Sequence, residues 1–118
     1  MEWDVEFTDE FEDWWTSLNE EEQTSIDASV QLLIEYGPNL KRPHSDTVNG
    51  SKHNNMKELR TQHQGRPLRT FFAFDPNRTA ILLIGGDKTG DNRFYDQMVP
   101  IADELFDVYL AEIQEEKN

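Results

Sequence analysis

The stretch LRTFFAFDPNRTAILLIGGD, residues 68–87, decides the fold because it holds two apolar runs separated by a tight-turn signal. Asp75 and Pro76 occupy the first two positions of a type I turn, where aspartate and proline are favoured. A turn of this kind between two apolar runs predicts a β-hairpin. Its strands are expected over residues 68–75 and 79–85.

Two more strands are predicted outside this hairpin. Residues 56–62 form one candidate, immediately before the hairpin. At the N-terminus Trp3, Val5 and Phe7 alternate with acidic residues, which is the pattern of a half-buried strand.

Two helices are predicted after the N-terminal strand. The apolar face of the first, which starts near Asp9, is formed by Phe11, Trp14, Trp15 and Leu18. Asn19 and Glu22 have the spacing of a capping box at the start of the second helix. The buried stripe of that helix is formed by Ile26, Val30, Leu33 and Ile34. Gly37 followed by Pro38 predicts its end, so we expect an antiparallel helical hairpin.

The remaining segments are a polar connection and a C-terminal helix. Residues 37–55 lack periodicity, and connections of this length are often functional or disordered. Pro100 suits the first position of a helix. The buried stripe expected for this helix consists of Ile101, Leu105, Val108 and Tyr109.

The expected order of elements is β-α-α-β-β-β-α, which places the chain in the α+β class. We expect one domain over residues 1–118, with a small antiparallel β-sheet flanked by the N-terminal helical hairpin and the C-terminal helix. All helices are expected on one side of the sheet.

Charge is distributed unevenly along the chain, whose formal net charge is −13. Residues 1–40 contain twelve acidic and no basic side chains, and residues 94–118 contain seven acidic and one basic. Residues 41–93 contain ten basic and five acidic side chains, a local charge of +5. A basic segment within an acidic chain can still bind an anionic ligand. We expect the acidic helical hairpin to face away from the sheet surface that bears Arg69.

Several classes of protein are disfavoured by what the sequence lacks. Without cysteine there are no disulfides or thiolate metal sites, which fits a reducing, cytoplasmic compartment. The N-terminus has no signal-peptide pattern. The aliphatic run at residues 80–84 is far shorter than the ~20 residues of a membrane span, so no membrane contact is expected. The GGDK sequence at residues 85–88 lacks the spacing of a P-loop.

The chain resembles the RelE/HigB toxins, in the phage-derived HigB-like branch of the RelE/ParE superfamily of type II toxin–antitoxin systems. The resemblance rests on the order of elements, on MKELR at residues 56–60, on residues 68–90 and on Phe94-Tyr95. It covers the chain from Trp3 to about Leu110. It implies a RelE-like fold, a helix-turn-helix antitoxin of the HigA type, and cleavage of mRNA on the ribosome that inhibits translation. DNA would be contacted only through the antitoxin.

The resemblance also implies functional residues. Arg69 corresponds to a strand arginine that faces the scissile phosphate, and we expect it to be exposed on its strand. The candidate catalytic residues are Arg69, Lys57, Arg60, Lys88, Tyr95 and His53. Further RNA contacts are assigned to Lys52, Arg66 and Arg93. Glu58 departs from the pattern, because some relatives have lysine there.

The residue types suit an endoribonuclease without a metal or another cofactor. RNA cleavage of this kind needs a base for the 2′-hydroxyl, cations near the phosphate and an acid for the leaving oxygen. Arginine binds phosphate through paired donors, and an aromatic ring stacks on an unpaired base. Lys57, His53 and Tyr95 remain alternatives for the base and the acid.

Two other functions remain open. A ParE-like protein would inhibit DNA gyrase and use the basic segment for protein contact. A catalytically silent member would only bind its antitoxin. The basic and aromatic set favours the nuclease, whereas the net charge of −13 favours the other two, because free RNA would be repelled.

Overall fold

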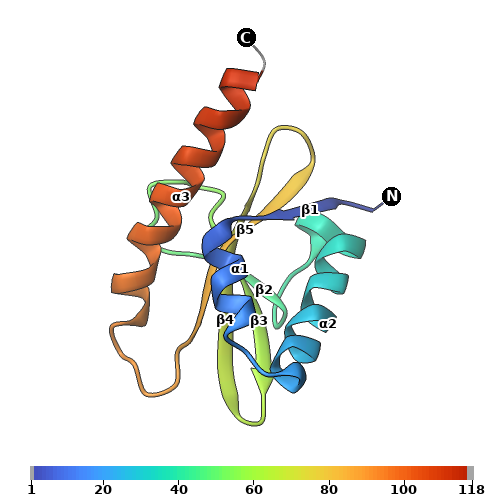
Figure 1. Ribbon diagram of the computed structural model, residues 1–118, viewed down its shortest axis with the longest axis vertical. Helices are drawn as coiled ribbons and strands as arrows, with labels where there is room; N and C mark the ends of the chain where they lie inside the picture. Colours follow the sequence, from blue (N-terminus) through green and yellow to red (C-terminus); the bar gives the residue numbers. More distant parts are fainter. Residues whose placement is uncertain (1, 117–118) are drawn as a thin grey trace.

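The computed structural model describes residues 2–116, which form a five-stranded sheet and three α-helices (Figure 1). The elements in chain order are β1 (Asp4–Phe7), α1 (Asp9–Thr16), α2 (Glu20–Tyr36), the 3-10 helix η1 (Gly37–Asn39), β2 (Ser45–Thr47), β3 (Lys57–His63), β4 (Arg66–Phe74), β5 (Thr79–Asp87) and α3 (Phe94–Glu116). The strands lie side by side in the order β1-β5-β4-β3-β2. The predicted α+β class is confirmed, with a helical hairpin before the central strands and a helix after them.

The central hairpin of β4 and β5 forms where the sequence predicts it. Phe74 pairs with Ala80, and the two strands continue antiparallel along their length. The carboxylate of Asp75 closes the turn by accepting hydrogen bonds from the backbone N–H groups of Asn77 (2.8 Å) and Thr79 (3.0 Å). An aspartate side chain that binds backbone ahead of it is a common way to fix a turn.

The sheet departs from the expectation in two respects. β1 pairs parallel to β5, so the sheet is mixed rather than wholly antiparallel. Helices also cover both faces, with α3 on one side and α1 and α2 on the other (Figure 1). The reason lies in β4, where Phe71 faces α3 while Phe72 faces the helical hairpin. A strand that is apolar on both faces needs cover on both.

Both ends of α2 follow the sequence signals. The Asn19 side chain accepts from the Glu22 backbone N–H (2.8 Å), and the Glu22 carboxylate accepts from the Asn19 N–H (2.9 Å), which completes the predicted capping box. Gly37 ends the helix with φ of 54°. A side chain at this position would also collide with the ring of Trp3, so both the positive φ and the lack of space require glycine.

The polar connection at residues 37–55 is more ordered than the sequence suggests. It includes η1 and the short edge strand β2, which pairs with β3 through Ser45 and Leu59. The following loop is fastened to α3, because the buried Asp103 accepts from the Ser51 hydroxyl and from the backbone N–H of Lys52. These contacts join residues about fifty positions apart, and no local pattern predicts them.

The predicted start of α3 is wrong and its predicted buried face is half right, because Leu105 and Tyr109 pack against the core but Ile101 and Val108 do not. The helix begins at Phe94 rather than at Pro100, which lies inside it. Phe94 and Val99 are buried in the core, and their burial offsets the backbone hydrogen bond that proline cannot make. The buried face therefore includes Ala102 and Phe106, whereas Ile101 and Val108 are exposed, contrary to the expectation.

Candidate functional site

Charged side chains gather on the face of the sheet that α3 only partly covers. Glu58 and Arg60 lie on β3, two residues apart and therefore on one face. Arg69 of β4 pairs directly with Arg60, and Glu58 pairs with Phe71 of the α3-facing core. Tyr95, in the first turn of α3, reaches the same place. Four of the residues singled out above thus meet at one site.

The centre of this site is a buried group formed by Glu58, Arg69 and Tyr95. The Tyr95 hydroxyl donates a hydrogen bond to Oε1 of Glu58 at 2.6 Å. The same oxygen lies 3.5 Å from Nε of Arg69, whose Nη1 donates to the Leu68 carbonyl at 3.1 Å. Arg69 is only 3% exposed and Glu58 7%, so both charges are removed from water. Each charge is needed to compensate the other.

The expectation of a solvent-exposed Arg69 is therefore wrong. Burial beneath the first turn of α3 was not visible in the sequence, because α3 starts six residues earlier than Pro100 indicates. Its Nε is buried without a hydrogen-bond partner among the described residues. Most buried donors are satisfied, so an unpaired one lowers the stability of the fold and suggests a role in the site.

Tyr95 is held in its neutral form. Burial is the main cause that raises the pKa of Tyr95, and the hydrogen bond to Glu58 raises it further. Arg69 acts on this pKa in the opposite direction. The phenol is thus a hydrogen-bond donor at neutral pH rather than a phenolate base.

Two cationic side chains, Lys88 and Arg60, lie beside this group, and we call the surface that they form its entrance. Nζ of Lys88 lies 5.2 Å from the centre of the Tyr95 ring, in a cation–π contact. Arg60 is half-buried beside the strand partner Arg69. The pKa of Asp46 is lowered, mainly by the hydrogen bond from Arg42, and the charge of Arg60 lowers it further. The entrance is therefore positive, and the pair of Arg42 and Asp46 lies at its β2 end.

Three of the predicted residues point elsewhere. Lys57 alternates with Glu58 and lies on the opposite face of β3, where its Nζ is 3.5 Å from Oγ1 of Thr47. Lys52 and His53 both bind Asp107 of α3, the histidine through Nε2 at 2.8 Å. The hydrogen bond from Lys52 is the main cause that lowers the pKa of Asp107. Lys52 and His53 thus help to fasten the loop to α3.

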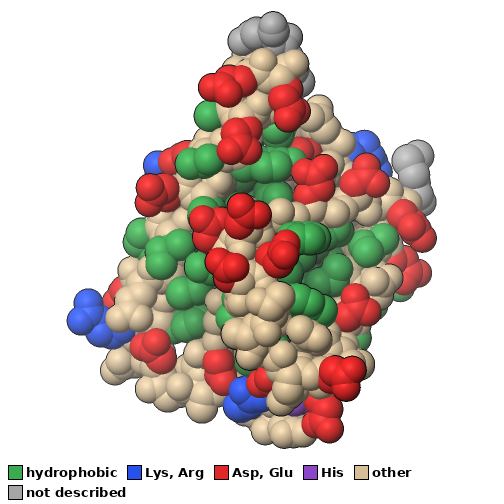
Figure 2. Space-filling model, viewed as in Figure 1, with side chains coloured by type: hydrophobic (Ala, Val, Ile, Leu, Met, Phe, Trp, Pro, Cys, Tyr) green, Lys and Arg blue, Asp and Glu red, His purple; other side chains and the backbone are tan. Residues whose placement is uncertain are grey.

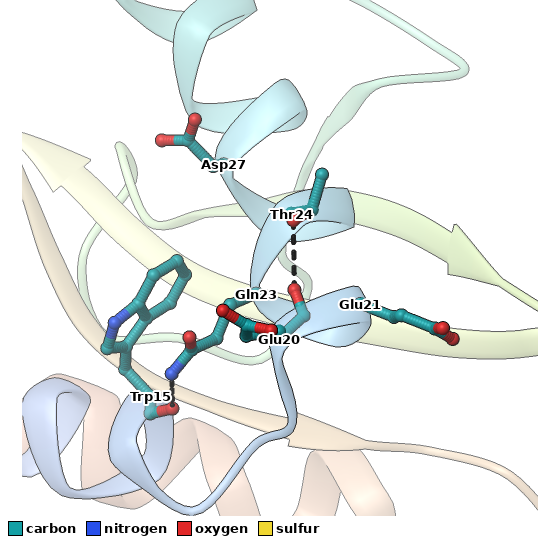
Figure 3. A pocket seen from close by; sticks show the side chains of 6 residues that line it. All are labelled: Trp15, Glu20, Glu21, Gln23, Thr24 and Asp27. Atoms are coloured by element: carbon teal, nitrogen blue, oxygen red, sulfur yellow. Dashed lines mark hydrogen bonds between the residues drawn. The ribbon is translucent and has the colours of Figure 1, made fainter.

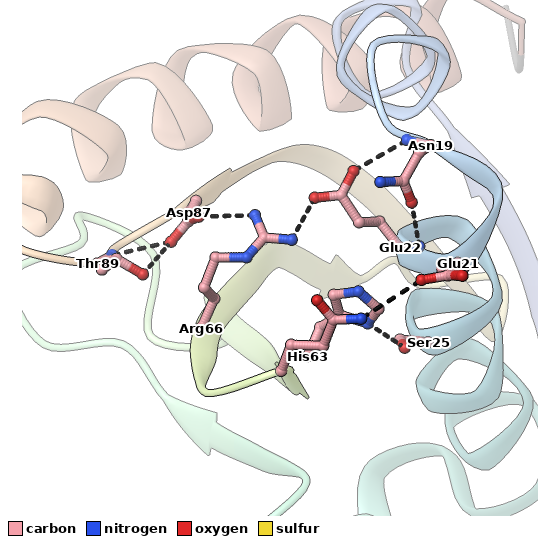
Figure 4. A network of polar contacts seen from close by, with 9 residues as sticks. Asn19, Glu21, Glu22, Ser25, His63, Arg66, Asp87 and Thr89 are labelled. Atoms are coloured by element: carbon pink, nitrogen blue, oxygen red, sulfur yellow. Dashed lines mark hydrogen bonds and ion pairs between the residues drawn. The ribbon is translucent and has the colours of Figure 1, made fainter.

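Arg66 lies between two acidic side chains at the far end of β4. Its Nη2 is 2.5 Å from Glu22 and its Nη1 is 3.1 Å from Asp87 (Figure 4). This bridge joins β4, β5 and the start of α2. Arg93 is exposed in the turn that leads into α3. The RNA-binding roles of Lys52, Arg66 and Arg93 stay predictions.

The acidic helical hairpin faces away from Arg69, as expected. α1 and α2 pack on the side of Phe72, and Arg69 projects from the opposite side with Phe71. Glu22 instead binds Arg66. The N-terminal acids therefore do not neutralise Arg69.

A hollow of about 560 Å³ at the junction of α1 and α2 is a different kind of surface (Figure 3). Its side chains bind the backbone: Gln23 donates to the Trp15 carbonyl at 2.8 Å and Thr24 to that of Glu20 at 2.9 Å. With Glu21 and Asp27 also lining it, it has no cation to hold an anion. The Gln23 hydrogen bond joins α2 to α1 across this hollow.

Glu58 is the residue that sequence reasoning overlooked. The sequence marks it only as a departure from lysine, yet it lies at the centre of the buried group. The alternation of side chains along a strand places Glu58 and Arg60 on one face, and this pattern could have identified Glu58 as a site residue.

No helix of residues 2–116 has both the length and the apolarity to cross a membrane.

Comparisons with known proteins show the family and the fold. Residues 13–107 match the family model "Phage derived protein Gp49-like (DUF891)". The chain is 48% identical over 101 residues to the protein assigned as toxin HigB3 of Mycobacterium tuberculosis, covering 85% of this chain and 87% of that protein. It is 44% identical over 106 residues to the protein assigned as toxin HigB2 of the same organism, covering 88% of this chain and 53% of that protein.

Solved structures of E. coli RelE share the fold. The isolated RelE toxin superimposes with a TM-score of 0.58 at 9% identity, covering 84% of this chain and 98% of RelE. A RelE mutant in the free state gives 0.57 at 9% identity, with 80% and 92% covered. A chain of the intact RelBE toxin–antitoxin complex gives 0.54 at 8% identity, with 71% and 94% covered. The chain belongs to the Gp49/HigB-like toxin family and has a RelE-like fold.

Proposed function

We propose that this protein is the toxin of a type II toxin–antitoxin system and that it cleaves mRNA on the ribosome. The observation that carries the proposal is the buried group of Glu58, Arg69 and Tyr95 with Lys88 and Arg60 at its entrance. It combines a carboxylate, a phenol and several cations at one place. These are the groups that phosphodiester cleavage needs.

Glu58 is the proposed general base. Its carboxylate takes the proton of the ribose 2′-hydroxyl, and the 2′-oxygen then attacks the adjacent phosphorus. The bond from phosphorus to the 5′-oxygen breaks, and that oxygen takes up a proton from solvent water, so the products carry a 2′,3′-cyclic phosphate and a 5′-hydroxyl. A carboxylate with a hydrogen-bonded partner is a common general base, whereas Lys57 and His53 point away from this group.

The other residues have complementary proposed roles. Lys88 and Arg60 contact the phosphate, because they are more exposed than Arg69 and lie beside the buried group. Arg69 holds the buried carboxylate of Glu58 and adds positive potential behind it. Tyr95 aligns Glu58 and offers its ring to a base of the RNA.

An antitoxin completes the proposed system. RelE is a component of a toxin–antitoxin complex, and this chain has the RelE fold. We expect a helix-turn-helix antitoxin of the HigA type to bind the protein. A neighbouring reading frame that encodes such a protein, and its co-purification with this chain, would support this part of the proposal.

The decisive experiment is induced expression followed by mapping of mRNA 5′ ends. The parent protein should arrest growth and create new 5′ ends within translated messages. Glu58→Gln should lower cleavage by about 10²-fold or more, since general bases contribute ~10²–10⁴-fold. Lys57→Gln, a neighbouring substitution on the other face of β3, should cleave like the parent.

Other outcomes would contradict the proposal. New 5′ ends that persist in Glu58→Gln and vanish in Lys57→Gln would assign the base to the lysine. Growth arrest with gyrase-dependent breaks in DNA and intact mRNA would identify the ParE-like alternative. A folded protein that binds an antitoxin but neither arrests growth nor cleaves mRNA would be the silent member.

A further inference from the structure

An open groove runs between α3 and the N-terminal segment, on the β1 side of the sheet. It is formed by β1, the first residues of α1 and the outer side of α3, and we name it the α3 groove. Its volume is about 680 Å³. The group of Glu58, Arg69 and Tyr95 lies on β3, β4 and the start of α3, so the α3 groove is a separate surface.

Apolar side chains are concentrated in this groove. Among residues 2–116 four large hydrophobic side chains are exposed, and three of them line it: Phe7 (56%), Ile101 (41%) and Val108 (50%). Leu105 lies between the last two on α3. Figure 2 shows hydrophobic side chains open to solvent on this side of the molecule. Clustered exposure of this kind marks an interaction surface, whereas scattered exposure does not.

Acidic side chains surround the apolar floor. Five of the residues that line the groove are carboxylates, and none of the lining residues is lysine or arginine. They are Glu6, Asp9, Glu10, Glu104 and Glu112. Figure 2 shows carboxylates beside and between the hydrophobic side chains of this face. A partner must therefore be apolar along its centre and positively charged along its sides.

The shape of the floor favours a helix. Ile101, Leu105 and Val108 follow one another at helical spacing along roughly 10 Å of α3, about two turns. A second helix can lie alongside such a row and place its own apolar stripe against it. A second copy of this chain fits poorly, because a symmetric contact would bring the same carboxylates together.

We propose that the α3 groove binds a basic amphipathic helix of a partner protein. In the toxin–antitoxin system proposed above, and resting on it, this partner is the antitoxin. A helix bound here leaves Glu58 and Arg69 uncovered, so it would neutralise the toxin by keeping it off the ribosome rather than by blocking the carboxylate.

The test uses a labelled synthetic helix as the probe. It is a peptide of about 15 residues with leucines at every third or fourth position, flanked by lysines, long enough to form a helix when bound. Two controls have the same length: a scrambled peptide of identical composition without the stripe, and one with glutamate in place of lysine. Fluorescence anisotropy measures binding to the full chain, with Val108→Glu and Tyr36→Glu as matched variants.

The lysine peptide should bind the parent, and both control peptides should bind at least about tenfold more weakly. Val108→Glu should lower the affinity for the lysine peptide about tenfold, as expected for a central apolar contact. Tyr36→Glu changes another exposed hydrophobic residue and adds the same charge, so it should bind like the parent. Melting curves confirm that both variants fold.

Three outcomes would overturn the proposal. The first is absence of binding by the lysine peptide. The second is equal binding of the scrambled peptide or of Val108→Glu, because the contact would then be charge attraction alone. The third is a concentration-dependent dimer of the parent that Val108→Glu dissociates, which would assign the groove to self-association. mRNA cleavage is scored separately, so loss of the proposed activity and loss of this binding are distinguishable.

Discussion

At the scale of single residues, the stability of the site depends on one buried pair of charges. Arg69 and Glu58 are 3% and 7% exposed, and the carboxylate is also bound by Tyr95. A buried pair of this kind adds little net stability compared with apolar residues, but removal of one partner leaves an uncompensated charge. Function and folding are therefore coupled at Arg69.

Arg69→Ala should destabilise the fold by about 3–5 kcal/mol, because it leaves the buried carboxylate of Glu58 without its cation. From the sequence alone an exposed arginine was expected, with a change within ~0.5 kcal/mol. The double variant Arg69→Ala with Glu58→Gln should recover part of the loss. Urea unfolding of the parent, Arg69→Ala and the double variant measures these differences in the free energy of unfolding. If Arg69→Ala is as stable as the parent, the pair of Arg69 and Glu58 is hydrated rather than buried.

At the scale of elements, the end of the hairpin is tied to α3 by one phenol. The Tyr109 hydroxyl lies 2.7 Å from Oδ2 of Asp75 and 3.3 Å from Oε2 of Glu6, so α3, the β4–β5 turn and β1 meet there. Burial is the main cause that raises the pKa of Tyr109, and Asp75 raises it further. The neutral phenol is therefore the form that the fold stabilises.

A pH dependence follows from Tyr109. Because its pKa is higher in the folded state than the ~10 of an unfolded tyrosine, its contribution is complete below about pH 10 and is lost as pH rises further. The parent should therefore lose stability above pH 10 more steeply than Tyr109→Phe does. Urea unfolding from pH 8 to 11 measures both slopes. The exposed Tyr36→Phe serves as control and should keep the parent's slope.

The elements that sequence predicts well are those specified locally. The capping box of Asn19 and Glu22 and the turn at Asp75 depend on residues a few positions apart, and all of these contacts form. The start of α3 was missed because burial of Phe94 against Phe71 outweighs the signal of Pro100, and that contact joins distant segments.

The candidate site was predictable in part for the same reason. Side chains alternate between the two faces of β3, so Glu58 and Arg60 share one face and Lys57 lies on the other. This part of the site could be predicted from the sequence alone. The burial of Arg69 depends on where α3 begins, and the position of His53 depends on the loop that Asp107 holds. Neither the burial of Arg69 nor the position of His53 follows from local spacing in the sequence, so neither could be predicted from it.

At the scale of the whole molecule, charge separates two surfaces with different proposed partners. The α3 groove is acidic and apolar, whereas the entrance to the Glu58 group is positive through Lys88 and Arg60. The formal charge of −13 nevertheless governs the field at a distance. An RNA strand that approaches from solution meets repulsion before it meets the positive entrance.

This charge distribution predicts that cleavage depends on the ribosome. The purified protein should leave naked mRNA intact at physiological salt and cut the same message in a translating extract, because ribosomal docking holds the RNA at the entrance despite the repulsion. Both reactions are measured by primer extension on one transcript, with Glu58→Gln as the inactive control. Equal cleavage of naked and translated mRNA by the parent would show that the local positive surface alone recruits RNA. The net negative charge would then have no part in restricting the proposed nuclease to the ribosome.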